Sequence, residues 1–522
     1  MSICADGVTH SCFYVPALVH GTWCTCMCRC INPAACLGEA ALSNMGAINA
    51  SGNMTMDAYK TAQCAPAYQG NVCGDCKDGY GKVRPFLCRK CMSRVTIVML
   101  YTVGALAIIG MIKLLMYFHH SSNTTIRKSL EDAISDELLK VLVLHGQWLD
   151  IISNLVNVPW PATLALPLQI VNGIWSSSNG SSIGFECIFP RNAIPLSIQR
   201  VLFCLFTPVA IMCIVLLVEA IVHKFGPAVR DSRKEDSPTH TRHKLASLVV
   251  AVVFLSLPTW VSTAFSLFTC MQLDRPASLP YHAEAVGRFW VADMQQQCYA
   301  GYHKAWAFGL GIPLLLLLCV LLPGGVFVFM WRSRKHGLLI DAAFERHYGF
   351  MYHLWREEVC WWEAVVVLQT IGLVMVATFG FALGGYYQGL VTVAVLGLIV
   401  MLLSWVRPFK CPAANTTAVQ SACVLLLTSF TALTFLPYNG LEPGHVYGNI
   451  MGVVVLLLNV LFLAYATWRL ALTIDWAAAR EALRRFMGKG CGVKQHSSVK
   501  AVNGSSGGPP VESKDAGAEG QP

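Results

Sequence analysis

Residues 305–331 read AWAFGLGIPLLLLLCVLLPGGVFVFMW, a run of 27 residues without a charged side chain. As an α-helix this run is about 40 Å long, and the hydrocarbon core of a bilayer is ~30 Å thick. Helices of soluble proteins typically end after roughly 8–20 residues and carry a polar face. This stretch therefore predicts a membrane-spanning helix, and the rest of the chain follows the same pattern.

The composition is that of a membrane protein. Of the 522 residues, 55% are hydrophobic and only 13% are charged, against roughly 25% charged in an average soluble domain. We expect an all-α polytopic membrane protein with about nine transmembrane helices and a small N-terminal disulfide-rich extracellular module. The predicted spans lie near 95–118, 138–156, 198–222, 245–270, 305–331, 361–383, 388–406, 418–436 and 447–469.

Basic residues predict the orientation of these spans, because short cytoplasmic loops carry an excess of lysine and arginine. With the N-terminus outside, segments 119–137, 223–244, 332–359, 407–417 and the tail face the cytoplasm and hold 23 basic residues, against five in the opposite loops. The net charge of +9 then follows from topology and does not indicate nucleic-acid binding. We expect a plasma-membrane or endomembrane protein with its N-terminus outside or lumenal and its C-terminus cytoplasmic.

Residues 1–94 hold 12 of the 22 cysteines, and 64–91 contain two CxxC units that could hold zinc as thiolates or form disulfides. The outside location favours disulfides, and the neighbouring glycines suit the turns of an EGF-like module. Farther along, Cys270–Cys298 and Cys187–Cys298 are alternative pairings. The disulfide candidates are Cys64, Cys73, Cys76, Cys88, Cys91, Cys187, Cys270 and Cys298.

Two glycosylation sequons also fall on the outer side, at Asn53 and Asn179, and are the candidates for a glycoprotein. The sequons at Asn123 and Asn415 fall on the inner side, so we predict that they are unused. The first 20 residues lack the basic segment and apolar stretch of a signal peptide. Either the start of the chain is missing or the first span acts as an uncleaved signal.

The second predicted span carries polar side chains, which are costly inside a bilayer and are therefore functional candidates. Lys140, Gln147 and Asp150 follow one another at spacings of seven and three, so they share one helix face. We expect this face to point into the bundle or a water-filled path, with permeation or gating as the functional hypothesis. A purely structural role is the alternative.

A tryptophan-rich segment precedes the sixth predicted span. Indole rings anchor helices at the membrane surface, and nearby charges could form an interfacial network. Plain anchoring without any further role is the alternative. The candidate network consists of Arg356, Trp361, Trp362, Glu363 and Arg407.

The chain contains a series of short motifs: KVLVLHGQ at 140–147, VPWP at 158–161, YGFMYHLWREEVCWWE at 348–363, then Gln388, RPF at 407–409 and Asn415. They resemble elements of transient-receptor-potential (TRP)-like multi-pass membrane proteins of algae and ciliates. In those proteins a Cys-rich run like YQGNVCGDCKDGYG at 68–81 precedes the membrane domain. The resemblance covers about 64–470 and implies a cation channel or channel-like transporter. Segment 437–446 is too short for a TRP-type pore helix and filter, so a pore would be built differently, within each subunit.

The expected domains are a Cys-rich extracellular module over 1–94, a multi-pass transmembrane domain over 95–470, a basic juxtamembrane amphipathic helix over 471–496 and a disordered cytoplasmic tail over 497–522. The amphipathic helix could rest on the anionic inner leaflet or pack on cytoplasmic loops. Its basic residues are Arg480, Arg484 and Arg485.

No Walker, HExxH, GxSxG or kinase motif is present, so we expect neither enzyme activity nor a cofactor or metal. The expected partners are membrane lipid and further copies of the chain in a homo-oligomer. Two rival functions remain. One is a non-conducting surface receptor or adhesion protein that uses the Cys-rich module, and the other is a lipid-handling membrane protein.

Overall fold

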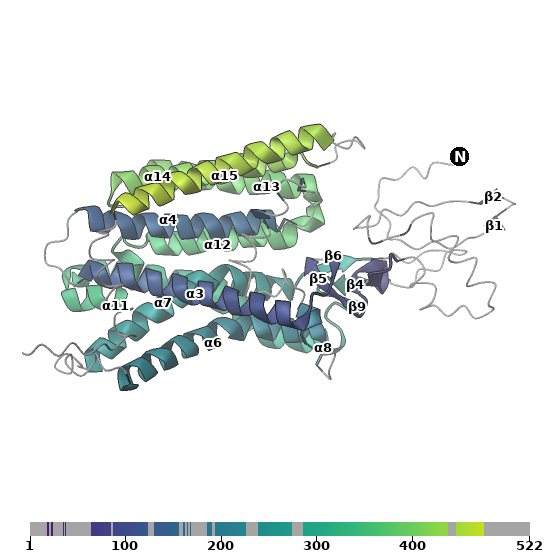
Figure 1. The fold of residues 1–522 in the computed structure, drawn as a ribbon, viewed down its shortest axis with the longest axis horizontal. Coiled ribbons are helices and arrows are strands. Elements are labelled where there is room, and N and C mark those ends of the chain that lie inside the picture. The colour runs from purple at the N-terminus through teal and green to yellow at the C-terminus, as the bar shows by residue number, and fades with distance from the viewer. Residues whose placement is uncertain are drawn as a thin grey trace, which may run out of the picture. The chain divides into compact units, whose positions relative to one another are not determined.

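Long apolar helices dominate the computed structural model of the chain (Figure 1). It describes 64–84, 87–123, 130–155, 185–189, 194–225, 238–273, 286–436 and 445–473, with a few shorter pieces within 18–37 and 160–168. Residues up to Thr473 form one compact unit. The sequons at Asn53 and Asn179 and the basic residues Arg480, Arg484 and Arg485 lie outside the described residues.

Eight of the described helical stretches are long and apolar enough to cross a membrane. Each lies within a few residues of a predicted span. Their large apolar side chains are exposed in great number on the bundle surface, where lipid would cover them. The helices are α3 (Arg94–Asn123), α6 (Leu196–Phe225), α7 (Pro238–Ser266), the continuous stretch α8 to α10 (Gly301–Lys335), α12 (Trp362–Phe379), α13 (Gly385–Val406), α14 (Pro412–Leu433) and α15 (His445–Thr473).

A ninth long helix, α4 (Leu130–Ser153), corresponds to the second predicted span. Its sequence holds six charged residues, so it is less apolar than the eight helices above. In the structure α4 nevertheless packs against α3, α12, α14 and α15 (Figure 1), and nearly every described side chain from Glu137 to Ile152 is buried. It is thus an interior helix whose polar face meets other helices rather than lipid. The expected fold class of about nine helices is confirmed.

Prolines and glycines interrupt several spans without ending them. Pro208 and Pro258 lie inside α6 and α7. The stretch from Gly301 to Lys335 contains two π-helical segments, Ala307–Gly311 and Leu316–Leu321, around the short α9 (Ile312–Leu315). A proline removes one backbone donor, so its helix must find another partner for the freed carbonyl.

A small disulfide-rich module adjoins one end of the bundle. Its strands form two antiparallel pairs, and a three-stranded sheet between α7 and α8 lies against it. The module encloses a small core of its own cysteines with Tyr68. The strands are β3 (Tyr68–Gln69), β4 (Asp75–Cys76), β5 (Tyr80–Arg84), β6 (Leu87–Lys90), β7 (Cys270–Gln272), β8 (Arg288–Trp290) and β9 (Asp293–Gln297), and a separate two-residue pair joins β1 (Leu18–Val19) to β2 (Thr22–Trp23).

At the opposite end of the bundle, α11 (Ala342–Tyr352) and the segment that follows it connect α10 to α12. Burial raises the pKa of the Tyr352 phenol, and the nearby Glu345 and Asp341 raise it further. Burial likewise raises the pKa of the Cys360 thiol. Both groups therefore stay protonated and act as packing residues of this connection, where Tyr352 donates to the Leu339 carbonyl at 3.2 Å.

Candidate functional site

The charged centre of the bundle is an ion pair between α4 and α12. Lys140 is only 1% exposed, and its Nζ lies 2.5 Å from Oε2 of Glu363. Glu363 lies in the first turn of α12, where the helix dipole favours a carboxylate. Burying either charge alone would cost several kcal/mol. Each charge therefore offsets the burial cost of the other.

Two aromatic rings complete the surroundings of the Lys140 ammonium group. The Phe254 centroid on α7 lies 5.3 Å from Nζ, and the Trp355 centroid lies 4.9 Å from it. Trp355 Nε1 also donates a hydrogen bond to Oε2 of Glu363 at 3.1 Å. Rings at this distance attract a cation, most strongly when water is excluded. The ion pair thus joins α4, α7, α12 and the segment before α12 at one point.

Trp355 is held in place by the loop between α13 and α14. Its ring packs against Phe409 with a centroid distance of 4.6 Å, and the two residues form an antiparallel bridge. Arg356 N donates to the Pro408 carbonyl at 2.8 Å, and Lys410 N donates to the Leu354 carbonyl at 3.2 Å. We call these paired segments, 354–356 and 408–410, the brace.

Asn415 holds the second segment of the brace, 408–410, in place. Its Oδ1 accepts from Phe409 N at 3.0 Å, and its Nδ2 donates to the carbonyls of Phe409 and Cys411 at 2.7 and 3.2 Å. Glu137 on α4 accepts from Cys411 N at 3.2 Å, at the start of α14. The short motifs that the sequence scatters over 140–147, 348–363 and 407–415 therefore meet in one place.

Gln147 lies nearly two turns beyond Lys140 and also contacts α7. Its Nε2 donates to the carbonyls of Phe254 and Leu255, both at 3.2 Å. The Phe254 carbonyl is the one that would accept from residue 258, and residue 258 is a proline without an N–H. Gln147 therefore replaces the donor that Pro258 removed. Asp150, the third predicted member of this face, instead accepts from Asn154, the residue that directly follows α4.

The predicted interfacial network is divided. Glu363 belongs to the ion pair, whereas Arg356 pairs with Glu358. Trp362 is buried, and Trp361 packs edge-on against Phe327 of α10. Arg407 ends α13 in the left-handed conformation at φ 48° and leads into the brace.

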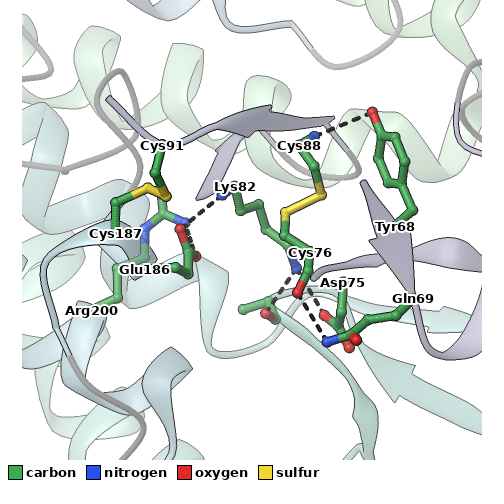
Figure 2. Close-up of a disulfide and its surroundings, with 11 residues drawn as sticks. Tyr68, Gln69, Asp75, Cys76, Lys82, Cys88, Cys91, Glu186, Cys187 and Arg200 are labelled. Carbon is green, nitrogen blue, oxygen red and sulfur yellow. Dashed lines mark hydrogen bonds and ion pairs between the residues drawn. A yellow bond between two sulfur atoms is a disulfide. The ribbon is translucent and has the colours of Figure 1, made fainter. Parts of the chain in front are cut away.

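The disulfide candidates form four bonds, which pair Cys64 with Cys73, Cys76 with Cys88, Cys91 with Cys187, and Cys270 with Cys298. Figure 2 shows that the third bond joins the end of the module to the segment before α6. Cys187 bonds to Cys91, so the alternative pairing with Cys298 is absent. All eight sulfurs are in disulfides, so none of them is a thiolate that could hold zinc.

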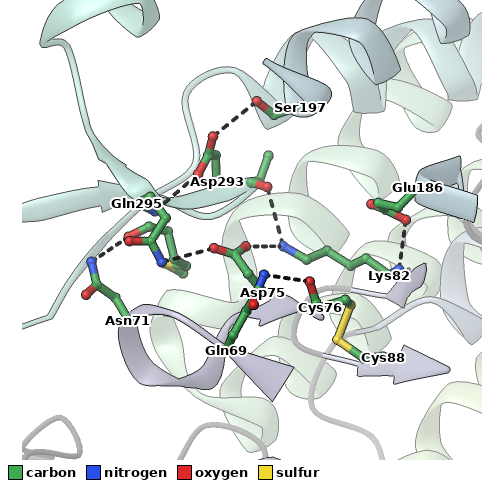
Figure 3. A network of polar contacts seen from close by, with 12 residues as sticks. Gln69, Asn71, Asp75, Cys76, Lys82, Cys88, Glu186, Ser197, Asp293 and Gln295 are labelled. Carbon is green, nitrogen blue, oxygen red and sulfur yellow. Dashed lines mark hydrogen bonds and ion pairs between the residues drawn. A yellow bond between two sulfur atoms is a disulfide. The ribbon is translucent and has the colours of Figure 1, made fainter. Parts of the chain in front are cut away.

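Polar contacts reinforce this junction between module and bundle (Figures 2 and 3). The buried Lys82 is its centre: its backbone N donates to Glu186, and its Nζ lies 3.2 Å from Asp75 Oδ1 and 3.4 Å from the Ala292 carbonyl. Asn71 donates to the Met294 carbonyl at 2.9 Å. The module is therefore fastened to two different connections of the membrane domain.

Asp293 continues the junction into the helices. Its Oδ2 accepts from Tyr302 of α8 at 2.6 Å and from Ser197 of α6 at 3.5 Å (Figure 3 draws the contact with Ser197). Glu186 also lies 3.8 Å from Arg200 of α6. The first turns of α6 and α8 thus share the Asp293 carboxylate, which lies between the two residues whose carbonyls bind the module, Ala292 and Met294.

Sequence reasoning missed several residues of these sites. Trp355, Phe409 and Asn415 lie within or beside the motifs that carry the resemblance, which was the available signal. Phe254 and Asp293 have no such signal, because a phenylalanine in an apolar span and an aspartate in a loop are ordinary. Only the packing of distant segments identifies them.

A family model described as "Transient receptor potential (TRP) ion channel" matches residues 181–483, which is more than half of the chain. The matched region begins before α6 and extends past the end of α15, and it contains the brace and Glu363. Neither the comparison with curated proteins nor the comparison with solved structures gives a match.

Proposed function

Because this chain belongs to the transient receptor potential (TRP) ion channel family, we propose that it conducts cations across the membrane that it spans. The family match over more than half of the chain carries this proposal. The bundle supplies membrane-crossing helices and an interior helix, α4, with an unusual number of polar contacts. Several copies of the chain would assemble in the membrane, as in other members of a channel family.

The Lys140–Glu363 ion pair is the proposed gating element. It is buried, and it joins three helices and the brace. We take the paired arrangement as one state of this contact and a separated arrangement as the other. A bistable contact of this kind can hold a bundle in one state until another interaction outweighs it. We assign the paired arrangement to the closed channel, because it ties α4 to α12 and to the brace.

The test is ion flux through the purified protein in liposomes under varied calcium, voltage and membrane tension. Lys140→Met removes one charge of the pair, and we expect at least a tenfold rise in resting flux, equivalent to about 1.4 kcal/mol in favour of the open state. Lys335→Met is the matched control, since Lys335 is an exposed lysine that stacks on Trp331.

Lys140→Met could also act by unfolding the protein, because it leaves Glu363 buried without its partner. The exchange Lys140→Glu with Glu363→Lys therefore completes the test. Resting flux close to wild type in the exchanged protein supports the ion pair as the gate. Wild-type flux in Lys140→Met would show that the ion pair is not the gate. If neither the wild-type protein nor any folded variant carries ions, the proposal that this protein is a channel is wrong.

The orientation follows the basic residues: the disulfide module outside or lumenal, and the brace and the tail cytoplasmic. Single-cysteine labelling with a membrane-impermeant reagent in intact cells tests it. A cysteine in the module, placed at Asp78, is expected to react, and one at the exposed Ile340 after α10 to react only after permeabilisation. The opposite pattern would reverse the orientation.

A receptor function is the second candidate, and the junction favours it. Lys82 binds Glu186 before α6 and the Ala292 carbonyl, and the adjacent Asp293 bonds to α6 and α8, so that a ligand on the module could act on both helices. If liposomes that contain the folded protein show no ion flux, we expect the intact protein to bind a soluble partner instead. Mutation of exposed residues of the module should then abolish this binding.

A further inference from the structure

The disulfides of the described chain differ in how far solvent reaches them. The bonds Cys64–Cys73 and Cys76–Cys88 lie in the core of the module, where each cysteine is at most 8% exposed. The cysteines of the other two bonds, Cys91–Cys187 and Cys270–Cys298, are partly exposed. A disulfide breaks when a thiolate attacks one of its sulfur atoms, so access decides which bond reacts. The two partly exposed bonds are therefore the ones that a thiol in solution reaches first.

These two bonds also connect the ends of membrane helices, whereas the two buried bonds connect residues of the module alone. Cys91 lies just before α3, and its partner Cys187 lies in the segment before α6. Cys270 follows α7, and its partner Cys298 lies just before α8. Cutting a partly exposed bond would therefore change a link between helices and leave the core of the module intact.

The small sheet after α7 makes the Cys270–Cys298 bond the less consequential of the two. Cys270 is paired with Trp290 between β7 and β8, and Cys298 N donates to the Arg288 carbonyl at 2.9 Å. Both ends of this bond are thus held by backbone hydrogen bonds to β8. The turn that carries Cys187, Phe185–Cys187, belongs to no sheet of the described chain. Its covalent bond to Cys91 is therefore not duplicated by strand pairing.

Aromatic packing would keep Cys187 with α6 if its bond to Cys91 were cut. Phe185 is completely buried and stacks on Phe189 with a centroid distance of 4.2 Å. Both rings pack against Phe203 of α6, at centroid distances of 5.5 and 5.6 Å. Reduction would therefore separate the module, which ends with Cys91, from α6 and its attached turn.

Polar contacts would keep the two thiols near one another. Lys82 N donates to Glu186 at 2.8 Å, its Nζ lies 3.4 Å from the Ala292 carbonyl, and Asn71 donates to the Met294 carbonyl (Figures 2 and 3). Such contacts are far weaker than a covalent bond and open by thermal motion. Reduction would therefore loosen the coupling between the module and α6 reversibly, without releasing the module.

The charges around the bond assign different roles to its two sulfur atoms. The neighbours of Cys91 in the sequence include three exposed basic residues, Arg89, Lys90 and Arg94. Basic surroundings stabilise a thiolate and attract an anionic thiol. Cys187 instead follows Glu186, whose carboxylate is only partly offset by Arg200 at 3.8 Å (Figure 2). Cys91 is therefore the better leaving group, and Cys187 is the sulfur that is attacked.

We propose that the Cys91–Cys187 bond is a site of thiol–disulfide exchange with a small anionic thiol of the glutathione class, and that its reduction uncouples the module from α6. The thiolate of the small molecule forms a bond to Cys187 Sγ. The bond between the protein sulfurs breaks, and its electron pair stays on Cys91 Sγ, which takes a proton from water.

A second small thiolate completes the reaction. It attacks the sulfur of the small molecule in the mixed disulfide and releases Cys187 as a thiolate. Two small thiols are thereby oxidised to their disulfide, and one disulfide of the protein is reduced to two thiols. This reaction does not depend on conduction, so it goes beyond the proposed channel function and can be tested without it.

The direct test is the rate of exchange in the purified full chain in lipid nanodiscs with reduced glutathione. Samples are quenched with N-ethylmaleimide, and peptide mass spectrometry identifies each reacted cysteine. We expect Cys91 and Cys187 to react at least tenfold faster than Cys76 and Cys88, with the mixed disulfide on Cys187. Equal rates at both bonds would overturn the proposal. A mixed disulfide on Cys91 alone would overturn the assigned direction of attack.

A charge variant tests the part played by the basic residues. Arg89→Gln with Lys90→Gln should slow the exchange with glutathione about three- to tenfold, because the anionic thiol is attracted less. The neutral thiol 2-mercaptoethanol should show a much smaller change. Arg288→Gln, which removes an exposed basic residue of β8, is the matched control. An equal loss of rate with both thiols would overturn the electrostatic attraction of the anionic thiol.

Hydrogen exchange tests the uncoupling. After reduction by glutathione, we expect exchange at the Lys82 amide, which donates to Glu186, to rise by at least tenfold. Cys91→Ser with Cys187→Ser should show this fast exchange without glutathione, and Cys213→Ser, which removes an exposed free thiol, is the control. The reduced wild-type protein gives the answer if the double variant does not fold. Unchanged exchange at Lys82 after complete reduction of the bond would overturn the uncoupling.

Flux in liposomes then separates this proposal from the channel proposal. If the wild-type protein conducts, flux that changes with glutathione in the wild type and not in the double variant shows that the bond acts on the channel. If it conducts nothing although Cys91 and Cys187 exchange, the channel proposal fails and the exchange site stands. A response to glutathione that persists in the double variant would overturn an effect of this bond on the channel.

Discussion

Gln147 shows how one side chain can compensate for a proline within a membrane helix. Pro258 lies inside α7 and leaves the Phe254 carbonyl without its usual donor, and no water is available in a bilayer core to replace it. The amide of Gln147 reaches this carbonyl and the next one from α4. The glutamine therefore compensates on one helix for a proline on another.

This compensation predicts a coupled pair of substitutions. Gln147→Leu should lower the free energy of unfolding by about 1–3 kcal/mol, because a buried carbonyl loses its partner. The same substitution in a Pro258→Ala background should cost much less, because the new alanine would supply the missing N–H. Thermal unfolding of the four proteins in detergent measures the coupling. Additive effects would contradict the link between Gln147 and Pro258.

At the scale of elements, the brace joins segments that are separated by about fifty residues in the sequence. Asn415 makes three hydrogen bonds to 409 and 411, and this holds Phe409 against Trp355. Trp355 in turn donates to Glu363. A loop that looks unremarkable therefore positions the aromatic wall of a buried ion pair.

Asn415→Ala should loosen the brace and leave the spans intact. We expect hydrogen exchange at the Phe409 and Lys410 amides to rise by at least tenfold, because the first loses its acceptor and the second depends on the loop conformation. Thr416→Ala is the control, since the Thr416 hydroxyl is exposed and bonds within its own helix. Unchanged exchange in Asn415→Ala would mean that the brace does not need this residue.

At the scale of the whole molecule, the junction connects the disulfide module to the membrane helices. The Cys91–Cys187 bond closes a separation of 96 residues that includes α3 and α4. Lys82 and Asn71 add polar contacts between the module and the loop that follows α7 (Figure 3), and Asp293 in the same loop bonds to Tyr302 of α8. The module is therefore part of the same cooperative unit as the helices it touches.

Replacing both Cys91 and Cys187 with serine should lower the stability of the module by about 4–5 kcal/mol on the loop-entropy estimate. Limited proteolysis should then cleave within 64–91 at lower temperature or denaturant than in wild type. Cys213→Ser, which removes an exposed free cysteine, is the control. Cleavage of the double variant at the wild-type rate would show that the polar contacts alone hold the module.

The sequence determined the architecture, because the features that specify it are local. Runs of apolar residues give the spans whatever they pack against, and a basic-residue bias is read from the loops alone. The number of helices and the disulfide-rich region are confirmed, and the bounds of α12 and α13 lie within four residues of the predicted spans. The polar face of α4 was also visible, through the spacing of Lys140, Gln147 and Asp150.

Only the tertiary structure decided which groups that polar face meets. Spacing places Lys140 and Gln147 on one side of a helix, but the partners Glu363, Phe254 and Trp355 come from segments more than 100 residues away. The same holds for His145, which contacts Ser421 and Phe462 on two later helices. The physical reason is that burial and pairing of polar groups depend on how all helices pack together, and no local pattern records that packing.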